Sequence, residues 1–198
     1  SLLKNQDQQQ LNPEVTSFLQ YIESGTQHMH QLLEDLLHYS TLRIDTTKFE
    51  AVQLPKIVDE IVEEYKQALT LQHTHISITG TLPTIYAESK HIKSLITQLI
   101  GNALKFQAPN RDGQIEIRSF EKNNKTFIEI KDNGIGIKKV HQQKVFRIFQ
   151  RLNKDDYNGT GIGLATCKKI VELYEGEIEL QSEIGVGTRV CFSLGRVS

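Results

Sequence analysis

The chain has 198 residues, of which 38% are hydrophobic, enough for one ordinary domain with an appendage or for two small domains. Its formal net charge of −1 at pH 7 gives no bulk electrostatic reason to expect nucleic acid or a membrane surface as a partner. No apolar run approaches the ~18 residues of a membrane-spanning helix, and no signal-peptide pattern opens the chain. We therefore expect a soluble, cytoplasmic fragment, although its parent protein could still be membrane-anchored.

Cysteines and histidines give little sign of a metal or redox site. Cys167 and Cys191 show neither a CxxC motif nor zinc-type spacing, so two thiols are expected, most simply as small buried side chains. The closely spaced histidines are His28 with His30 and His73 with His75. Each pair could bind a metal in principle, but no third ligand stands at a sensible spacing, and surface histidines are the simpler interpretation.

A long amphipathic helix is expected near the N-terminus. The polar, glutamine-rich start has no Met and suggests a piece of a longer protein, and the run Asn12-Pro13-Glu14 then supplies an N-cap, a first-turn proline and an acidic residue. Apolar positions repeat every seven residues in two rows, which are Val15, Ile22, Met29 and Leu36 and, beside them, Leu11, Phe18, Gly25, Leu32 and Tyr39. Such a helix needs a partner helix, supplied from upstream or by another protomer; packing on the following domain is the alternative.

A linker over residues 41–47 separates this helical region, residues 1–45, from a mixed region, residues 46–198. Alternating and continuous apolar runs predict strands over residues 49–54, 76–78, 83–86, 114–120, 125–131, 177–182 and 188–194. Helical periodicity predicts helices over residues 55–71, 88–106 and 166–174. The second region therefore combines helices and strands in one α/β domain.

An acidic residue closes one of these strands. Side chains alternate along a strand, so Ile128, Ile130 and Asp132 should face the core together. A buried carboxylate is costly unless a protein donor or a ligand satisfies it. Two glycines follow, Gly134 and Gly136, and they either let a ligand come close to the backbone or merely make a turn.

Two further patterns suggest an anion site. Gln98, Asn102 and Lys105 form a polar stripe of two amides and a cation on the helix predicted over residues 88–106. The glycine run over residues 159–163 leads directly into a helix, whose first N–H groups attract anions. This run does not follow a strand, as a dinucleotide fingerprint should, and the P-loop pattern is absent.

In combination and in this order, the motifs closely resemble the catalytic ATP-binding domain of sensor histidine kinases, in the ATPase group shared with gyrase, Hsp90 and MutL. The matching segments are residues 98–106 (N box), 132–137 (first glycine box), 145–151 (F box), 159–164 (second glycine box) and 185–188 (a final glycine turn). The resemblance runs from about residue 46 to residue 194. The helix before it, ending over residues 32–40, is similar to the second helix of the kinases' dimerisation and phosphoacceptor hairpin, notably in the phytochrome-like branch.

The resemblance implies an α/β (α+β) two-layer sandwich, in which helices cover one face of a mixed sheet, preceded by the long coiled-coil-like helix. It also implies that Asp132 accepts a hydrogen bond from the adenine amino group, with Thr188 nearby through water. Asn102 would hold Mg²⁺ through its amide oxygen, Lys105 would meet phosphate, and Arg151 would orient the γ-phosphate, which makes Lys105 and Arg151 the catalytic pair. The implied ATP-binding residues are Asn102, Lys105, Phe106, Asp132, Gly134, Gly136, Ile137, Phe149, Arg151, Gly159, Thr160, Gly161, Gly163, Leu164 and Thr188.

Aromatic residues have implied positions too, and one residue departs from the family pattern. Phe106 would pack near adenine or ribose, and Phe146 with Phe149 would seat the F box. Gln98 stands where the family usually has a first N-box asparagine; as a second candidate Mg²⁺ ligand it keeps the amide oxygen but adds a methylene group. The family's phosphoacceptor histidine is followed by an acidic residue and soon by a proline, and none of the seven histidines has that context, so we expect the acceptor upstream of Ser1.

The expected function is ATP- and Mg²⁺-dependent transfer of the γ-phosphate to a histidine, for relay to a response-regulator aspartate. The expected partners are a response-regulator receiver domain and a second protomer bound through the N-terminal helix, with no nucleic acid and no direct membrane contact. Two alternatives stay open: a nucleotide-binding scaffold without kinase activity, and an ATPase of the gyrase or Hsp90 type.

Overall fold

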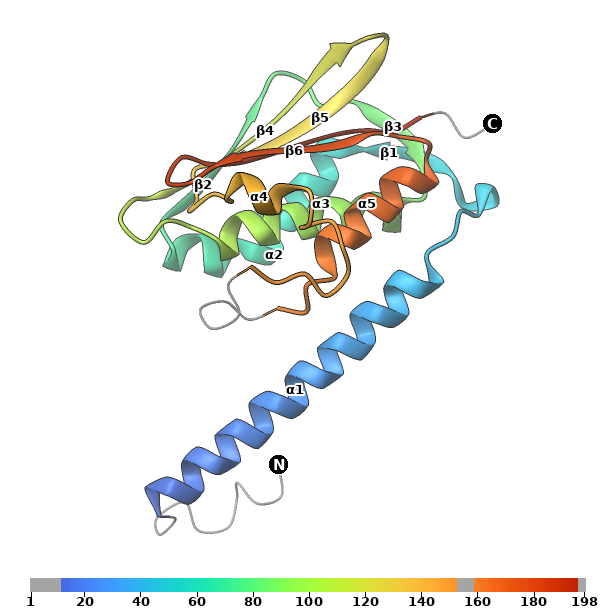
Figure 1. Ribbon diagram of the computed structural model, residues 1–198. Helices are drawn as coiled ribbons and strands as arrows, with labels where there is room; N and C mark the ends of the chain where they lie inside the picture. Colours follow the sequence, from blue (N-terminus) through green and yellow to red (C-terminus); the bar gives the residue numbers. More distant parts are fainter. Residues whose placement is uncertain (1–11, 153–158, 196–198) are drawn as a thin grey trace.

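The computed structural model describes residues 12–152 and 159–195, and it shows one long helix beside a two-layer body (Figure 1). The polar start, Leu11 of the predicted seam, and the polar run over residues 153–158 lie outside the described residues. In the body, helices cover one face of a mixed sheet, which confirms the predicted fold class.

The sheet has five strands in the order β2-β4-β5-β7-β6, and a separate pair joins β1 to β3. The strands are β1 (Glu50–Gln53), β2 (Thr74–Thr79), β3 (Thr84–Ala87), β4 (Gly113–Lys122), β5 (Lys125–Asp132), β6 (Ile178–Glu183) and β7 (Gly187–Ser193). The helices are α1 (Pro13–Thr41), α2 (Leu54–Leu71), α3 (Ser89–Lys105), α4 (Lys139–Gln142) and α5 (Gly163–Leu173), with a 3-10 turn at Thr46–Lys48. Only the β2–β4 pairing in the large sheet is parallel.

The β4–β5 hairpin is tighter than the sequence predicted. Lys122 pairs with Lys125, so only Asn123 and Asn124 form the loop. Both asparagines have positive φ, 53° and 59°, as a two-residue type I′ turn requires. Asparagine tolerates this conformation better than most residues. Strand β5 ends at Asp132, one residue later than the sequence predicted.

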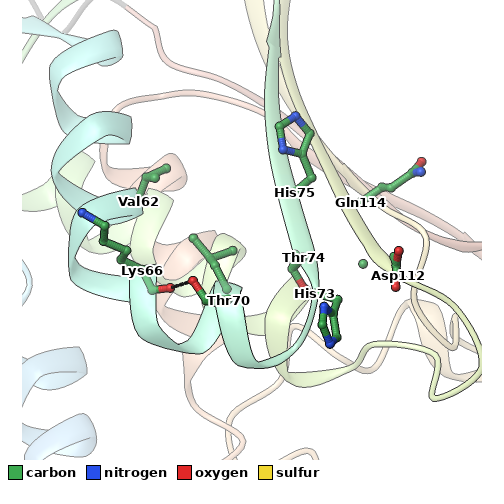
Figure 2. A pocket seen from close by; sticks show the side chains of 10 residues that line it. Val62, Lys66, Thr70, His73, Thr74, His75, Asp112 and Gln114 are labelled. Atoms are coloured by element: carbon green, nitrogen blue, oxygen red, sulfur yellow. Dashed lines mark hydrogen bonds between the residues drawn. The ribbon is translucent and has the colours of Figure 1, made fainter.

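A surface cavity of about 460 Å³ opens between α2 and the start of β2 (Figure 2). Val62, Lys66 and Thr70 border it from α2, and His73 and His75 border it from the strand side. Among the described residues, no group of three histidine, cysteine or acidic side chains gathers where a metal ion could bind. None of the predicted site residues lines this cavity.

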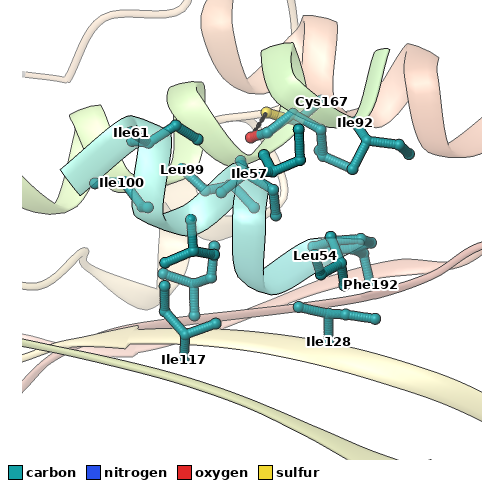
Figure 3. Close-up of a cluster of buried hydrophobic side chains, with 14 of the residues drawn as sticks. Leu54, Ile57, Ile61, Ile92, Leu99, Ile100, Ile117, Ile128, Cys167 and Phe192 are labelled. Carbon is teal, nitrogen blue, oxygen red and sulfur yellow. Dashed lines mark hydrogen bonds between the residues drawn. The ribbon is translucent and has the colours of Figure 1, made fainter. Parts of the chain in front are cut away.

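The core lies between the sheet and its helices (Figure 3). Leu54, Ile57 and Ile61 of α2 belong to one buried cluster with Ile117 and Ile128, which project from the sheet. Each such side chain contributes about 1.5–3 kcal/mol when it is fully buried. Cys167 is completely buried in the same cluster, and burial raises the pKa of its thiol, so it acts as an apolar side chain.

Helix α1 stands apart from the body along most of its length (Figure 1). Asn12 caps it by accepting a hydrogen bond from the Glu14 N–H at 3.1 Å. Its exposed apolar side chains are Val15, Phe18, Leu19, Tyr21, Ile22, Met29, Leu33, Leu36 and Leu37. Packing of the seam on the domain that follows is therefore wrong for most of the helix, and a partner helix stays a prediction.

The sheet face away from the helices carries a buried acid. Glu129 is only 1% exposed, and it accepts a hydrogen bond from Arg118 Nε at 2.7 Å. Cys191 Sγ donates to its other oxygen at 3.1 Å, and Arg189 lies 3.4 Å from that oxygen. Burial alone would raise the pKa of Glu129, but these hydrogen bonds and the two guanidinium charges hold it below its usual range.

Glu129→Gln is expected to lower the free energy of unfolding at neutral pH and to leave it nearly unchanged in acid. A carboxyl with a depressed folded-state pKa stabilises the fold above its unfolded pKa of about 4.3, and this contribution is lost as pH falls through the folded-state pKa. Urea unfolding of both proteins between neutral pH and strong acid measures the difference. A difference that grows toward acid pH would contradict the assignment.

Candidate functional site

Asp132 ends β5 in the same strand phase as Ile128 and Ile130, which pack in the core with the helices. Its Oδ1 accepts hydrogen bonds from the N–H groups of Gly134 at 2.8 Å and Thr188 at 3.1 Å. Burial raises the pKa of Asp132, while these two bonds and the charge of Arg111 oppose the rise. Among the described residues, Oδ1 accepts both hydrogen bonds donated to this carboxylate, which leaves Oδ2 for a ligand.

A series of hydrogen bonds links Thr188, which binds this carboxylate through its N–H group, to the end of the first glycine box. Thr188 Oγ1 lies 2.9 Å from Ser182 Oγ, which also accepts a hydrogen bond from the Ile137 N–H at 2.8 Å. Gln142 Nε2 donates to the carbonyl oxygens of Ile137 and Ser182 at 2.9 and 2.6 Å. The predicted residues Ile137 and Thr188 are thus joined by two residues that the sequence analysis missed. Ser182 was detectable as a polar residue in the core phase of β6.

Arg111 is a third missed residue, and it fixes the loop after β5. Its guanidinium donates to the carbonyl oxygens of Asn133 at 2.8 Å, Gly134 at 3.1 Å and Gly185 at 2.6 Å. It therefore joins the first glycine box to the turn between β6 and β7. Arg111 lies in a polar loop without periodicity, so no sequence signal marked it.

The first glycine box is packed closely against its own protein. A Cβ on Gly134 would overlap the carbonyl oxygen of Phe106, and the Ile135 N–H donates to that same oxygen at 2.9 Å. Gly136 has a φ of +72°, and a Cβ there would overlap the carbonyl oxygen of Glu183. Backbone packing alone thus requires both glycines, whatever ligand approaches them.

The polar stripe of α3 faces the second glycine box. Nδ2 of Asn102 is buried and has no hydrogen-bond partner among the described residues. Lys105 Nζ lies 5.0 Å from the centroid of the Phe106 ring. Burial and the nearby charge of Arg151 both lower the pKa of Lys105. Lys105 and Arg151 thus place two positive charges close together at this end of the stripe, where they would attract an anion.

The second glycine box lies directly on this stripe. A Cβ on Gly159 would overlap Lys105 Nζ, and one on Gly163 would overlap Gln98 Oε1. Helix α5 begins at Gly163, so its N-terminus, with its partial positive charge, lies beside Gln98 of the stripe. The structure brings together, around α3, the two glycine boxes that are far apart in the sequence.

The F box meets the second glycine box through its backbone. Val145 is buried and Phe146 half-buried, whereas Phe149 is 54% exposed with a φ of +61°. The expectation that Phe149 seats this segment is therefore wrong, and Val145 takes that place. A Cβ on Gly161, whose φ is +73°, would lie 3.0 Å from the carbonyl carbon of Phe149.

Two predicted site residues have their side chains turned away from the stripe. Leu164 packs against the core as a partly buried side chain. Thr160 is 7% exposed, and its hydroxyl donates to Asp35 Oδ2 of α1 at 2.5 Å. The side chain of Thr160 is therefore engaged with α1.

Comparisons with known proteins agree with this geometry. A family model described as "Histidine kinase-, DNA gyrase B-, and HSP90-like ATPase" matches residues 87–197. Cyanobacterial phytochrome A of Nostoc sp. is 34% identical over 195 residues, which cover 98% of this chain and 25% of the phytochrome. The chain thus spans about a quarter of the length of that relative.

Solved structures share the fold. Full-length ShkA in complex with AMPPNP has a TM-score of 0.72 at 21% identity, covering 93% of this chain and 39% of ShkA. Histidine kinase ThkA in complex with the response regulator TrrA has a TM-score of 0.73 at 18% identity, covering 99% of this chain and 56% of ThkA. None of the helices in the described parts of our chain is long and apolar enough to cross a bilayer.

Proposed function

Because the chain belongs to the family of histidine kinase-, DNA gyrase B- and HSP90-like ATPases, we propose that it is the ATP-binding catalytic part of a sensor histidine kinase. In this proposal, residues 46–198 bind ATP with Mg²⁺. Residues 1–45 contribute one helix of the dimerisation hairpin. The adaptive-response sensory kinase SasA of Prochlorococcus marinus is 33% identical over 169 residues, which cover 80% of this chain and 44% of SasA, and this similarity favours a kinase over an ATPase of the gyrase or Hsp90 type.

The observation that carries this proposal is the fixed carboxylate of Asp132. Two main-chain N–H groups hold Oδ1, and no described residue donates to Oδ2. An acceptor in this position is complementary to the exocyclic amino group of adenine. Guanine presents a carbonyl oxygen at the corresponding ring position, which would face the carboxylate unfavourably.

The other end of the site suits a triphosphate with its metal ion. Nδ2 of Asn102 is buried and has no hydrogen-bond partner among the described residues. The oxygen and the nitrogen of a side-chain amide are told apart only by the hydrogen bonds around them, so the two atoms can be exchanged. With the amide turned, its oxygen would be the free atom, which suits Mg²⁺, with Gln98 as a second oxygen ligand. Bound Mg²⁺ would neutralise phosphate charge. Lys105, Arg151 and the N-terminus of α5 would position the phosphates.

In the parent protein, the Nε2 lone pair of a histidine would attack the γ-phosphorus. The bond from this phosphorus to the bridging oxygen would break, and ADP would leave. The phosphoryl group would then pass to an aspartate of a response regulator. The ThkA complex with a response regulator and the exposed apolar seam of α1 support a receiver-domain partner and a homodimer respectively.

The test supplies the phosphoacceptor hairpin separately, together with γ-labelled ATP and Mg²⁺. We expect label on a histidine of the hairpin, and none when EDTA is added. ATP binding without transfer to any histidine hairpin, including that of the parent protein, would instead favour a nucleotide-binding scaffold. Rapid ATP hydrolysis without an acceptor would favour an ATPase.

A further inference from the structure

Helix α1 contacts the second glycine box through a carboxylate held in place by its own helix. Gln31 Nε2 donates to Asp35 Oδ1 at 2.9 Å, one turn apart. This leaves Asp35 Oδ2 for the hydroxyl of Thr160, at 2.5 Å. Both ends of the bond are thus oriented, because Thr160 is buried and Asp35 is half-buried.

A second contact, one turn further along α1, joins this helix to α5. Lys169 Nζ, on α5, donates to the carbonyl oxygen of Tyr39 at 2.6 Å and lies 4.5 Å from the centroid of its ring. Helix α5 follows the second glycine box directly, so α1 holds both this box and the helix that it starts. Within the described residues, this end of α1 is where the helix touches α5, as its course in Figure 1 shows.

In this arrangement the second glycine box lies against side chains to which the proposed function assigns the phosphates and their metal ion. The backbone of Gly159 lies against Lys105 Nζ, and that of Gly163 lies against Gln98 Oε1. The Ile162 N–H, at the start of α5, is directed to Thr160 Oγ1 at 3.4 Å rather than to an external anion. Gly159 therefore covers one side of the Lys105 ammonium group, and a phosphate would compete with it there.

We propose that Asp35 is a positioning residue that holds the second glycine box over Lys105 and thereby limits entry of the nucleotide. This inference rests on the proposed function, since it concerns the same phosphate site. The observed affinity for the nucleotide is proportional to the fraction of molecules in which the site is open. Weakening the hydrogen bond between Asp35 and Thr160 raises this fraction and therefore raises the affinity. A hydrogen bond to a charged group shifts such an equilibrium by about tenfold or more.

The experiment follows binding of fluorescent mant-ATP with Mg²⁺ to the full chain by stopped flow. Asp35→Ala is expected to bind about tenfold more tightly, mainly through faster association. Glu34→Ala is the matched control, because Glu34 is the adjacent acid of α1 and pairs only with exposed His30 at 3.2 Å among the described residues. Its affinity should stay near that of the unaltered chain.

Changes at Thr160 separate the hydrogen bond from the charge of Asp35. Thr160→Val should reproduce the faster association, Thr160→Ser should behave as the unaltered chain, and Asp35→Ala should add little to Thr160→Val. Unchanged or weaker binding in both Asp35→Ala and Thr160→Val, with unchanged melting temperatures, would overturn the inference. An unaltered chain that binds no mant-ATP would instead remove the proposed function, and with it the premise.

Discussion

Replacing Asp132 with asparagine should weaken ATP binding roughly 30- to 150-fold, a loss of about 2–3 kcal/mol, with the fold intact. Asparagine has the shape of aspartate, and its oxygen can still accept the N–H groups of Gly134 and Thr188. Its NH₂ group then takes the place of Oδ2 and faces the amino group of adenine. Two donors face each other there, and the buried site offers neither of them an acceptor.

Isothermal titration with ATP and Mg²⁺ measures this loss, and the melting temperature without nucleotide reports on the fold. Asp112→Asn is the matched control, because Asp112 is an exposed acid in the loop before β4 and its side chain takes no part in the carboxylate network. GTP supplies a second check, since its affinity should fall less than that of ATP in Asp132→Asn. Unchanged ATP affinity in this variant would remove the adenine role of Asp132.

The adenine end of the site follows from local sequence rules. Strand alternation placed Asp132 on the core side of β5, and the structure has Ile128 and Ile130 buried beside it. The helical period likewise put Asn102 and Lys105 on one side of α3. Arg111 could not be predicted in this way, because it binds carbonyl oxygens from two loops that only the tertiary fold brings together.

The F box and α1 show the limit of family resemblance as a guide to side-chain positions. Phe149 matches the motif, yet it is 54% exposed with positive φ, because the backbone of Gly161 packs against this turn. Thr160 matches the second glycine box, yet its hydroxyl is directed to Asp35. Motifs specify which segments meet, whereas side-chain direction depends on neighbours such as Asp35, which is 125 residues from Thr160 in the sequence.

Asn102→Ala is expected to lower the rate of phosphoryl transfer on the order of 100- to 1000-fold, which corresponds to about 3–4 kcal/mol in activation free energy. It should also abolish the strengthening of ATP binding by Mg²⁺. The alanine removes the amide whose buried atom has no partner among the described residues. Because no hydrogen bond to that atom is lost, the free energy of unfolding should stay the same or rise slightly. Loss of function with retained stability is the result expected of a ligand-binding side chain.

Gln98→Ala distinguishes a specific metal ligand from a polar stripe that only attracts phosphate. Gln98 lies one helical turn before Asn102, and its Oε1 already lies against Gly163, so it is less available to a metal ion. ATP affinity should be measured against free Mg²⁺ concentration in both variants. If Asn102 is the principal ligand, Gln98→Ala keeps the Mg²⁺ dependence and Asn102→Ala loses it. Equal effects would mean that the two amides share the ion, and a Mg²⁺ dependence preserved in Asn102→Ala would exclude Asn102 as a ligand.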